Sequence, residues 1–96
     1  MPRYILLSTL TCEGTKTVKE RPDRIQEVNK EVEAFGAKVV DQYAVLGTYD
    51  FVTVLEAPDN DVVMKISVDL CSRGTMKMLS MPAIPIPEFI SNLKKK

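Results

Sequence analysis

The sequence predicts an α+β fold of the ferredoxin-like type, with a four-stranded antiparallel sheet and the element order βαββαβ. Two stretches, residues 4–10 and 46–58, carry apolar residues on both faces, as strands at the centre of a sheet do. Two others, residues 22–36 and 59–74, repeat apolar residues at three- and four-residue steps, as helices do. Two interleaved right-handed β-α-β units place the first and third strands in the middle of the sheet.

The first strand, residues 4–10, leads into a helix that Thr11 can cap with its hydroxyl. This first helical piece is weak, because Val18 is its only large apolar residue before Pro22. Pro22 suits the first turn of a second helical piece, which Gly36 ends in left-handed conformation. The apolar stripe of the second piece consists of Ile25, Val28, Val32 and Phe35.

The middle of the chain predicts a hairpin followed by a helix. Residues 37–46 form a more polar strand that suits a sheet edge, and Gly47 and Thr48 make a short turn into the third strand. Pro58 stops that strand, and residues 59–61 supply caps and negative charge to the next helix. The buried stripe of that helix consists of Val62, Val63, Ile66 and Leu70.

The end of the chain is rich in methionine and proline. Residues 75–81 form the fourth strand, and residues 82–87 form an extended arm or edge, because proline lacks the donor that a central strand needs. A last short helix is expected over residues 88–93. We therefore expect one domain over residues 1–82 and a C-terminal arm with a short helix over residues 83–96.

Composition excludes several classes of function. The 13 basic residues balance the 13 acidic residues, so no net field attracts nucleic acid or an anionic membrane. The chain has no histidine, the commonest general base and metal ligand, and its two cysteines form no C-x-x-C pair. We expect no metal, no cofactor, no nucleic-acid or membrane partner, and a cytoplasmic protein with reduced thiols.

The expected sheet also predicts a partner. Two helices cover one face of four strands, and the other face carries Leu, Ile, Val, Phe and Met side chains. Leaving such a face in water exposes a larger apolar patch than soluble monomers usually tolerate. We therefore expect a homo-oligomer, a dimer or a multiple of dimers, with the open sheet faces packed together. The proline-rich arm is expected either to cover part of this face or to clasp the partner.

Several short motifs together resemble the GYD-domain family. Residues 47–51 read Gly-Thr-Tyr-Asp-Phe, the G-x-Y-D-F form often seen in that family, and further similar segments lie within residues 2–60. These segments are Pro2-Arg3-Tyr4, Thr11-x-x-Gly14, Pro22-x-Arg24, Gly36-x-Lys38 and Glu56-Ala57-Pro58-Asp59. The resemblance implies a ferredoxin-like domain of the dimeric α/β-barrel type. It implies no general activity, since related barrels include cofactor-free monooxygenases, isomerases, haem enzymes and ligand-sensing domains.

Four residues are catalytic candidates, each with a structural alternative. Asp50 is a candidate general base, or it accepts backbone donors or pairs with an arginine. Tyr49 and Tyr43 are candidate hydrogen-bond donors in a pocket, or they pack their rings at strand ends. Cys12 lies near a helix N-terminus and is a candidate thiolate, or a small buried apolar residue.

Five residues are candidates for ligand binding. Arg3, Lys16 and Arg24 offer positive charge to an anion, and surface solvation is the alternative for Lys16 and Arg24. Met76 and Met78 offer an adaptable apolar lining, or a seam between two copies.

Two functions follow from these residues, and the first is our expectation. The first is a small homo-oligomeric ligand-binding or interaction domain without chemistry. The alternative is a cofactor-independent enzyme, resembling a monooxygenase or isomerase, that acts on a small apolar substrate with Asp50 as base and Tyr49 or Tyr43 as donor. An RNA-binding sheet is disfavoured, because exposed aromatic residues with basic neighbours are missing from the central strands.

Overall fold

The structure is a computed structural model that describes residues 1–95. All four strands pair antiparallel in one sheet of order β2-β3-β1-β4, so the predicted fold class and the central position of the first and third strands are confirmed. The elements in chain order are β1 (Arg3–Leu10), α1 (Cys12–Glu20), α2 (Arg24–Ala34), β2 (Lys38–Ala44), β3 (Phe51–Glu56), α3 (Asn60–Cys71), β4 (Met76–Ala83) and α4 (Ile86–Lys94).

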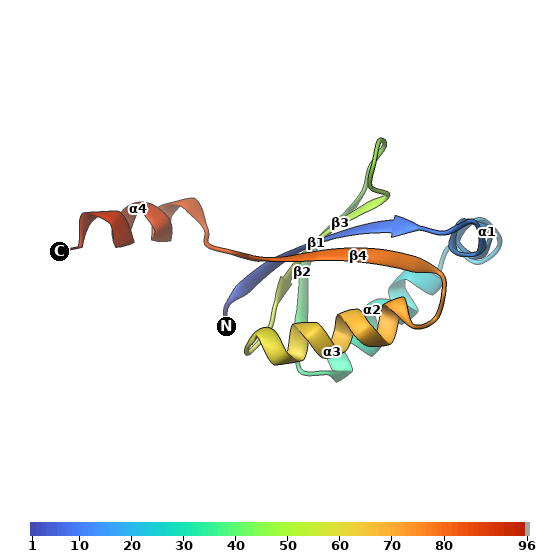
Figure 1. Cartoon of the computed structure of the whole chain (residues 1–96), viewed down its shortest axis with the longest axis horizontal. Coiled ribbons are helices and arrows are strands. Elements are labelled where there is room, and N and C mark those ends of the chain that lie inside the picture. The colour runs from blue at the N-terminus through green and yellow to red at the C-terminus, as the bar shows by residue number, and fades with distance from the viewer. Residues whose placement is uncertain (96) are drawn as a thin grey trace.

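The helices are distributed unevenly around the sheet. Figure 1 shows α2 and α3 side by side below the sheet, α1 beyond the end of β1, and α4 projecting past the opposite end. Among the described residues, no helix has both the length and the apolar character needed to cross a membrane. The helices α2 and α3 cover one face of the sheet, and α4 extends the molecule to 53 Å along its longest axis.

Capping residues set the helix ends as the sequence indicates. The Thr11 hydroxyl accepts a hydrogen bond from the Gly14 amide at 3.1 Å, and the Asp59 carboxylate accepts one from the Val62 amide at 3.0 Å. Each bond satisfies one of the amides that a helix start leaves unpaired. Gly36 follows α2 with a φ of 96°, a left-handed conformation that glycine adopts without strain.

The core lies between the sheet and the two covering helices. Leu55 of β3 and Ile66 of α3 are fully buried, and they pack with Leu6 of β1 and Val32 of α2. The remaining buried apolar residues are Tyr4, Ala37, Val63 and Leu70 together with Ala57. The core therefore joins the central strands to the stripes predicted for α2 and α3.

Several expected element boundaries differ from the structure. The connection before β3 is longer than a two-residue turn: β3 begins at Phe51, and the Val45 amide donates to the Asp50 carbonyl at 2.9 Å. Phe35, expected in the buried stripe of this helix, instead follows α2 as its C-terminal cap and is exposed. β4 continues through Pro82, which an edge strand tolerates because only one of its sides is paired.

The C-terminal arm expected over residues 83–96 contains α4, which begins at Ile86 rather than at residue 88. Proline is accepted in the first turn of a helix, because the amides there have no partner within the helix, so Pro87 does not delay the start. Lys96, the last residue of the expected arm, lies outside the described residues.

The second sheet face has no cover in the described chain. In the sheet register, Ile5 and Leu7 of β1 lie opposite Val54 and Val52 of β3, and Leu7 also lies opposite Leu79 of β4. These side chains alternate with those that face the helices, so they form one apolar surface on the far side of the sheet. We call this surface the open face; it also includes Tyr43 and Met81.

Candidate functional site

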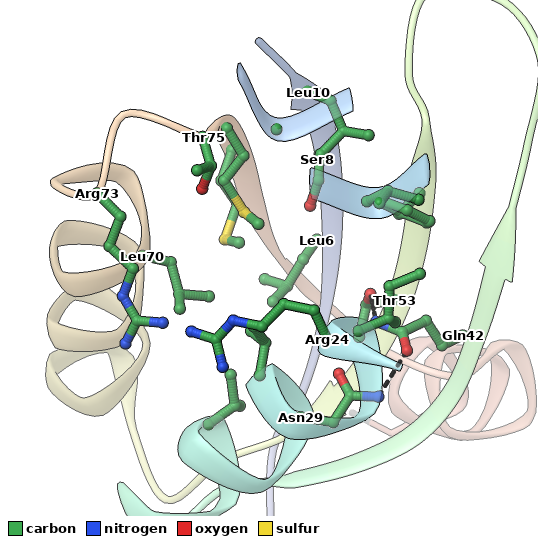
Figure 2. Close-up of a pocket in the computed structure, with 18 of the residues that line it drawn as sticks. Leu6, Ser8, Leu10, Arg24, Asn29, Gln42, Thr53, Leu70, Arg73 and Thr75 are labelled. Atoms are coloured by element: carbon green, nitrogen blue, oxygen red, sulfur yellow. Dashed lines mark hydrogen bonds between the residues drawn. The ribbon is translucent and has the colours of Figure 1, made fainter. Parts of the chain in front are cut away.

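A cavity of about 310 Å³ lies between the sheet and the helices, near the ends of β1 and α3. It exists because the first helical segment is broken: α1 ends at Glu20, and α2 begins at Arg24 after the bend at Pro22. α1 consequently turns away from the sheet and contributes only its inner residues, such as Val18, to the cavity wall. Figure 2 shows the space enclosed by β1, α2 and the end of α3.

Most of the cavity wall is apolar. Leu6 and Leu10 of β1, Val28 of α2, and Met76 and Met78 of β4 all line it. Branched and sulfur-containing side chains of this kind shape a surface that excludes water from an apolar ligand.

A chain of hydrogen bonds crosses one wall of the cavity. The Asn29 side-chain amide donates to Gln42 Oε1 at 2.7 Å, and Gln42 Nε2 donates to Thr53 Oγ1 at 3.0 Å. The Thr53 side chain is buried, and its hydroxyl still has a proton to donate after accepting the bond from Gln42. The chain fixes three polar side chains from α2, β2 and β3 against the cavity.

Ser8 places a second hydroxyl in the same wall. The residue is only 5% exposed, and Figure 2 shows its side chain directed into the cavity. Its neighbours Thr9 and Leu10 make side-chain or backbone bonds to the Thr48 carbonyl and the Asp50 carboxylate, but within residues 1–95 the Ser8 hydroxyl has no protein partner. Because Ser8 lines the cavity, a ligand can supply the hydrogen bond that the protein does not. The side-chain oxygen that is fully buried without a partner in the described residues belongs to Ser80, which does not line the cavity.

Two arginines and a glutamate close the rim between α2 and α3. Arg24 donates to Glu31 at 3.0 Å, and Arg73 donates to the other oxygen of the same carboxylate. The hydrogen bond from Arg73, assisted by the one from Arg24, holds the pKa of Glu31 below its usual range. The same bond to Glu31 raises the pKa of the Arg73 guanidinium, and Asp69 adds a further ion pair at 2.7 Å.

The structure does not bring the four catalytic candidates together. Asp50 accepts a hydrogen bond from the Leu10 amide at 2.7 Å, and the Asp50 amide donates to the Ser8 carbonyl at 2.8 Å. Tyr43 is 58% exposed on the open face, on the opposite side of the sheet from the cavity. Tyr49 lies in the loop before β3, and Cys12 is exposed at the start of α1. None of these four residues lines the cavity.

Three of the five ligand-binding candidates do line the cavity: Arg24, Met76 and Met78. Arg3 lies elsewhere, at the start of β1, where it pairs with Glu56 at 3.7 Å. Lys16 is exposed on α1. In the described residues, no group of three or more Cys, Asp or Glu side chains is arranged to hold a metal ion.

Several polar wall residues were not singled out from the sequence, among them Ser8, Asn29, Gln42 and Thr53. Ser8 carries a signal that could have identified it, because it occupies a helix-facing position of β1 between Leu6 and Leu10. Thr53 carries the same signal on β3, on the same face as Leu55. A polar residue on an otherwise apolar face predicts a bonded or a ligand-facing side chain.

Comparison with known proteins decides the family. The GYD domain model matches residues 4–93, nearly the whole chain. The protein belongs to the GYD-domain family. The match includes β4 and most of α4, so the family pattern extends well beyond residues 2–60.

One curated relative is similar over its full length. The glutamine synthetase and cystathionine beta-lyase binding protein of Thermus thermophilus is 50% identical over 95 residues, which are 98% of this chain and 100% of the relative. The name of this relative describes binding to enzymes.

Two solved structures share the fold. The crystal structure of MtbAldR matches with a TM-score of 0.65 and 16% identity over 88% of this chain. The match covers 52% of MtbAldR, so the GYD chain spans about half the length of that protein. The crystal structure of TTHA0845 from Thermus thermophilus matches with a TM-score of 0.55 and 18% identity, over 88% of this chain and 95% of the other. At these identities the two structures support the fold alone.

Proposed function

We propose that this GYD protein is a homo-oligomeric binding protein that acts through contacts with other proteins. The observation that carries the proposal is the open face, an apolar sheet surface that α1, α2 and α3 leave uncovered. Leu79, at 47% exposure, lies beside Leu7 on the edge strand β4 of this surface. A second copy of the chain presents the same surface, so two open faces can pack around a two-fold axis.

The sheet is small for an interface between two copies of the chain. A four-stranded sheet of about seven residues per strand has a flat area of roughly 440 Å². A stable interface usually buries about 800 Å² on each partner. Accessible surface exceeds this flat area because side chains project from the sheet, so the strands supply part of the interface and a second exposed apolar element can add to it.

α4 supplies that second element. Its apolar residues recur at three- and four-residue steps and are all exposed: Ile86, Phe89, Ile90 and Leu93. A helix of nine residues is marginal in water without packing. Figure 1 shows α4 projecting beyond its own sheet, away from the other described elements. In the proposed oligomer, α4 packs its apolar stripe against the second copy.

The name of the Thermus relative supports a role in binding enzymes. That relative is named for glutamine synthetase and cystathionine β-lyase, and it covers this chain almost completely. We therefore infer that the GYD oligomer binds one or both of these enzymes from its own source.

The enzymatic alternative has less support. It requires Asp50 and a tyrosine at one cavity, whereas Asp50 binds the Leu10 amide and Tyr43 lies on the other side of the sheet. A binding function needs no such convergence.

Binding to purified partners tests this function. Purified glutamine synthetase and cystathionine β-lyase from the same source are immobilised in turn, and the GYD protein is titrated over each surface. We expect saturable binding to at least one enzyme and none to an unrelated enzyme of similar charge. Absence of binding to both enzymes would contradict the inferred partners, and the oligomeric state is measured separately.

A further inference from the structure

The cavity has the size and the lining of a small-molecule site. Its volume of about 310 Å³ lies within the range of roughly 300–1,000 Å³ that is typical of ligand pockets. Leu6, Leu10 and Val28 give it apolar walls, and Met76 and Met78 can adjust their rotamers to a ligand. A small aliphatic or aromatic group therefore matches this space.

Two hydroxyl groups in the cavity wall can form hydrogen bonds with a ligand. The Ser8 hydroxyl has no protein partner in the described residues, and the Thr53 hydroxyl can donate beyond its bond from Gln42. Ser8 and Thr53 lie on adjacent strands and on the same face, since Ser8 pairs with Phe51 and Leu6 with Thr53. One oxygen or amide group of a ligand can meet both hydroxyls, which would satisfy Ser8 in the bound state.

The charged side chains at the rim are paired with one another, which favours a neutral ligand. The two arginines of the rim, Arg24 and Arg73, pair with three carboxylates, those of Glu27, Glu31 and Asp69. The positive charge is therefore compensated, and among the described residues of the rim no free guanidinium remains to hold an anion. A ligand carboxylate would have to displace Glu31 from two arginines at once.

We infer that this cavity binds a small, neutral molecule with an apolar body and one hydroxyl, carbonyl or amide group, which hydrogen-bonds to Ser8 and Thr53. This site extends the binding role proposed above to a low-molecular-weight ligand. It lies on the helix side of the sheet, so each chain can bind one molecule while its open face contacts a second copy.

Two matched probes test the inference. The fluorescence of 2-naphthol and of naphthalene is titrated with the full-length protein; the two compounds differ by one hydroxyl. We expect one 2-naphthol per chain and about fivefold weaker binding of naphthalene, the difference that one hydrogen bond of about 1 kcal/mol produces. Equal affinity for both probes would contradict the role of the two hydroxyls.

Two variants and a control locate the bound probe. Ser8→Ala removes one of the two hydroxyls that meet the ligand, so we expect the affinity advantage of 2-naphthol over naphthalene to shrink. Val28→Phe fills the cavity, so we expect neither probe to bind. Thr9→Ala removes a hydroxyl from the adjacent position, whose side chain faces away from the cavity, and should leave both affinities unchanged. Circular dichroism verifies that each variant is folded.

Amide chemical shifts give an independent readout. Addition of 2-naphthol should shift the amide signals of Ser8, Thr53 and Val28. Shifts confined to Leu79, Met81 or α4 would place the probe on the exposed apolar surfaces and overturn the inference. The two proposals fail separately, because Ser8→Ala leaves the open face intact and a charge placed at Leu79 leaves the cavity intact.

Discussion

At the scale of single residues, Asp50 connects two strands through its carboxylate. Its side chain accepts the Leu10 amide at 2.7 Å, at the point where β1 leads into α1. We predict that Asp50→Ala lowers the free energy of unfolding by about 1.5–3 kcal/mol, the usual contribution of a hydrogen bond to a charged group. Urea denaturation measures the change. Asp23→Ala is the control, since Asp23 precedes α2 without a side-chain cap bond, and an equal effect in both variants would contradict the assigned role.

Glu31 makes stability depend on pH. Its folded pKa is lowered by Arg73 and Arg24, so Glu31 contributes stability that is present above its usual value of 4.5 and is lost as the pH falls through the lower folded pKa. We predict that Glu31→Gln is less stable than the unmodified protein at pH 6–7, and that the gap narrows as the pH falls below 4.5. Thermal unfolding from pH 7 to pH 3 measures the gap.

The control for this pH series is Glu20→Gln, because Glu20 is exposed at the end of α1. Its stability should follow that of the unmodified protein at every pH. A gap for Glu31→Gln that stays constant down to pH 3 would show that the carboxylate is not held by the arginines. The effect should be small, since exposed ion pairs contribute about 0–1 kcal/mol.

At the scale of elements, the corner between β1 and α1 depends on close backbone contact. The Thr11 amide donates to the Thr75 carbonyl at 3.0 Å, and a Cβ atom on Gly14 would clash with the same carbonyl oxygen. We predict that Gly14→Ala destabilises the protein by about 1–3 kcal/mol, because the backbone must shift to admit the methyl group. Chemical denaturation checks this. Lys16→Ala on the same helix should be nearly neutral, and a neutral Gly14→Ala would contradict the close approach.

α4 is the element that separates folding from assembly. Figure 1 shows it apart from the other described elements, so Phe89→Asp should leave the melting temperature of the monomer unchanged. The same substitution places a charge in the apolar stripe, and we predict at least a tenfold loss of oligomer affinity in sedimentation velocity. Ser91→Asp, on the opposite side of the helix, is the matched control. An oligomer that tolerates both substitutions would exclude α4 from the interface.

The sequence predicts these elements well where periodicity decides and poorly where tertiary contacts decide. The stripes of α2 and α3 identify Val32, Ile66 and Leu70 as core residues, and all three are buried. The loop from Val45 to Asp50 was expected as a two-residue turn, because glycine indicates a turn but not its length. The ends of strands such as β2 and β3 depend on tertiary contacts, and local sequence patterns do not predict those contacts.

The candidate site was predictable only in part for the same reason. Arg24, Met76 and Met78 are candidates for ligand binding on sequence grounds, beside surface solvation for Arg24 and a seam between copies for the methionines, and all three line the cavity. The sequence predicts the break between the two helical pieces at Pro22, but not that α1 turns away from the sheet before this break and so leaves a cavity beside β1. Ser8 is visible in the sequence as a polar residue on an apolar face, but only the structure shows that its hydroxyl is directed into a cavity.

At the scale of the whole molecule, the open face of the sheet is where the hydrophobic content of the chain and the proposed assembly meet. The chain is 45% hydrophobic and has a net charge of zero, yet only one face of its sheet is covered in the described chain. Burial of apolar surface contributes about 25 cal/mol per Å², so the open face and the α4 stripe together favour association. Zero net charge adds little repulsion between copies.

The oligomeric state is the most direct test of the open face as an interface between copies of the chain. Sedimentation velocity is measured for the unmodified protein, for Leu79→Lys on the open face, and for Val68→Lys on the outer surface of α3, which is already exposed. We predict a dimer or a multiple of dimers of the 10.8 kDa chain for the unmodified protein and Val68→Lys, and a folded monomer for Leu79→Lys. A monomeric unmodified protein, or an oligomer that Leu79→Lys leaves intact, would contradict the assignment of the open face as the interface.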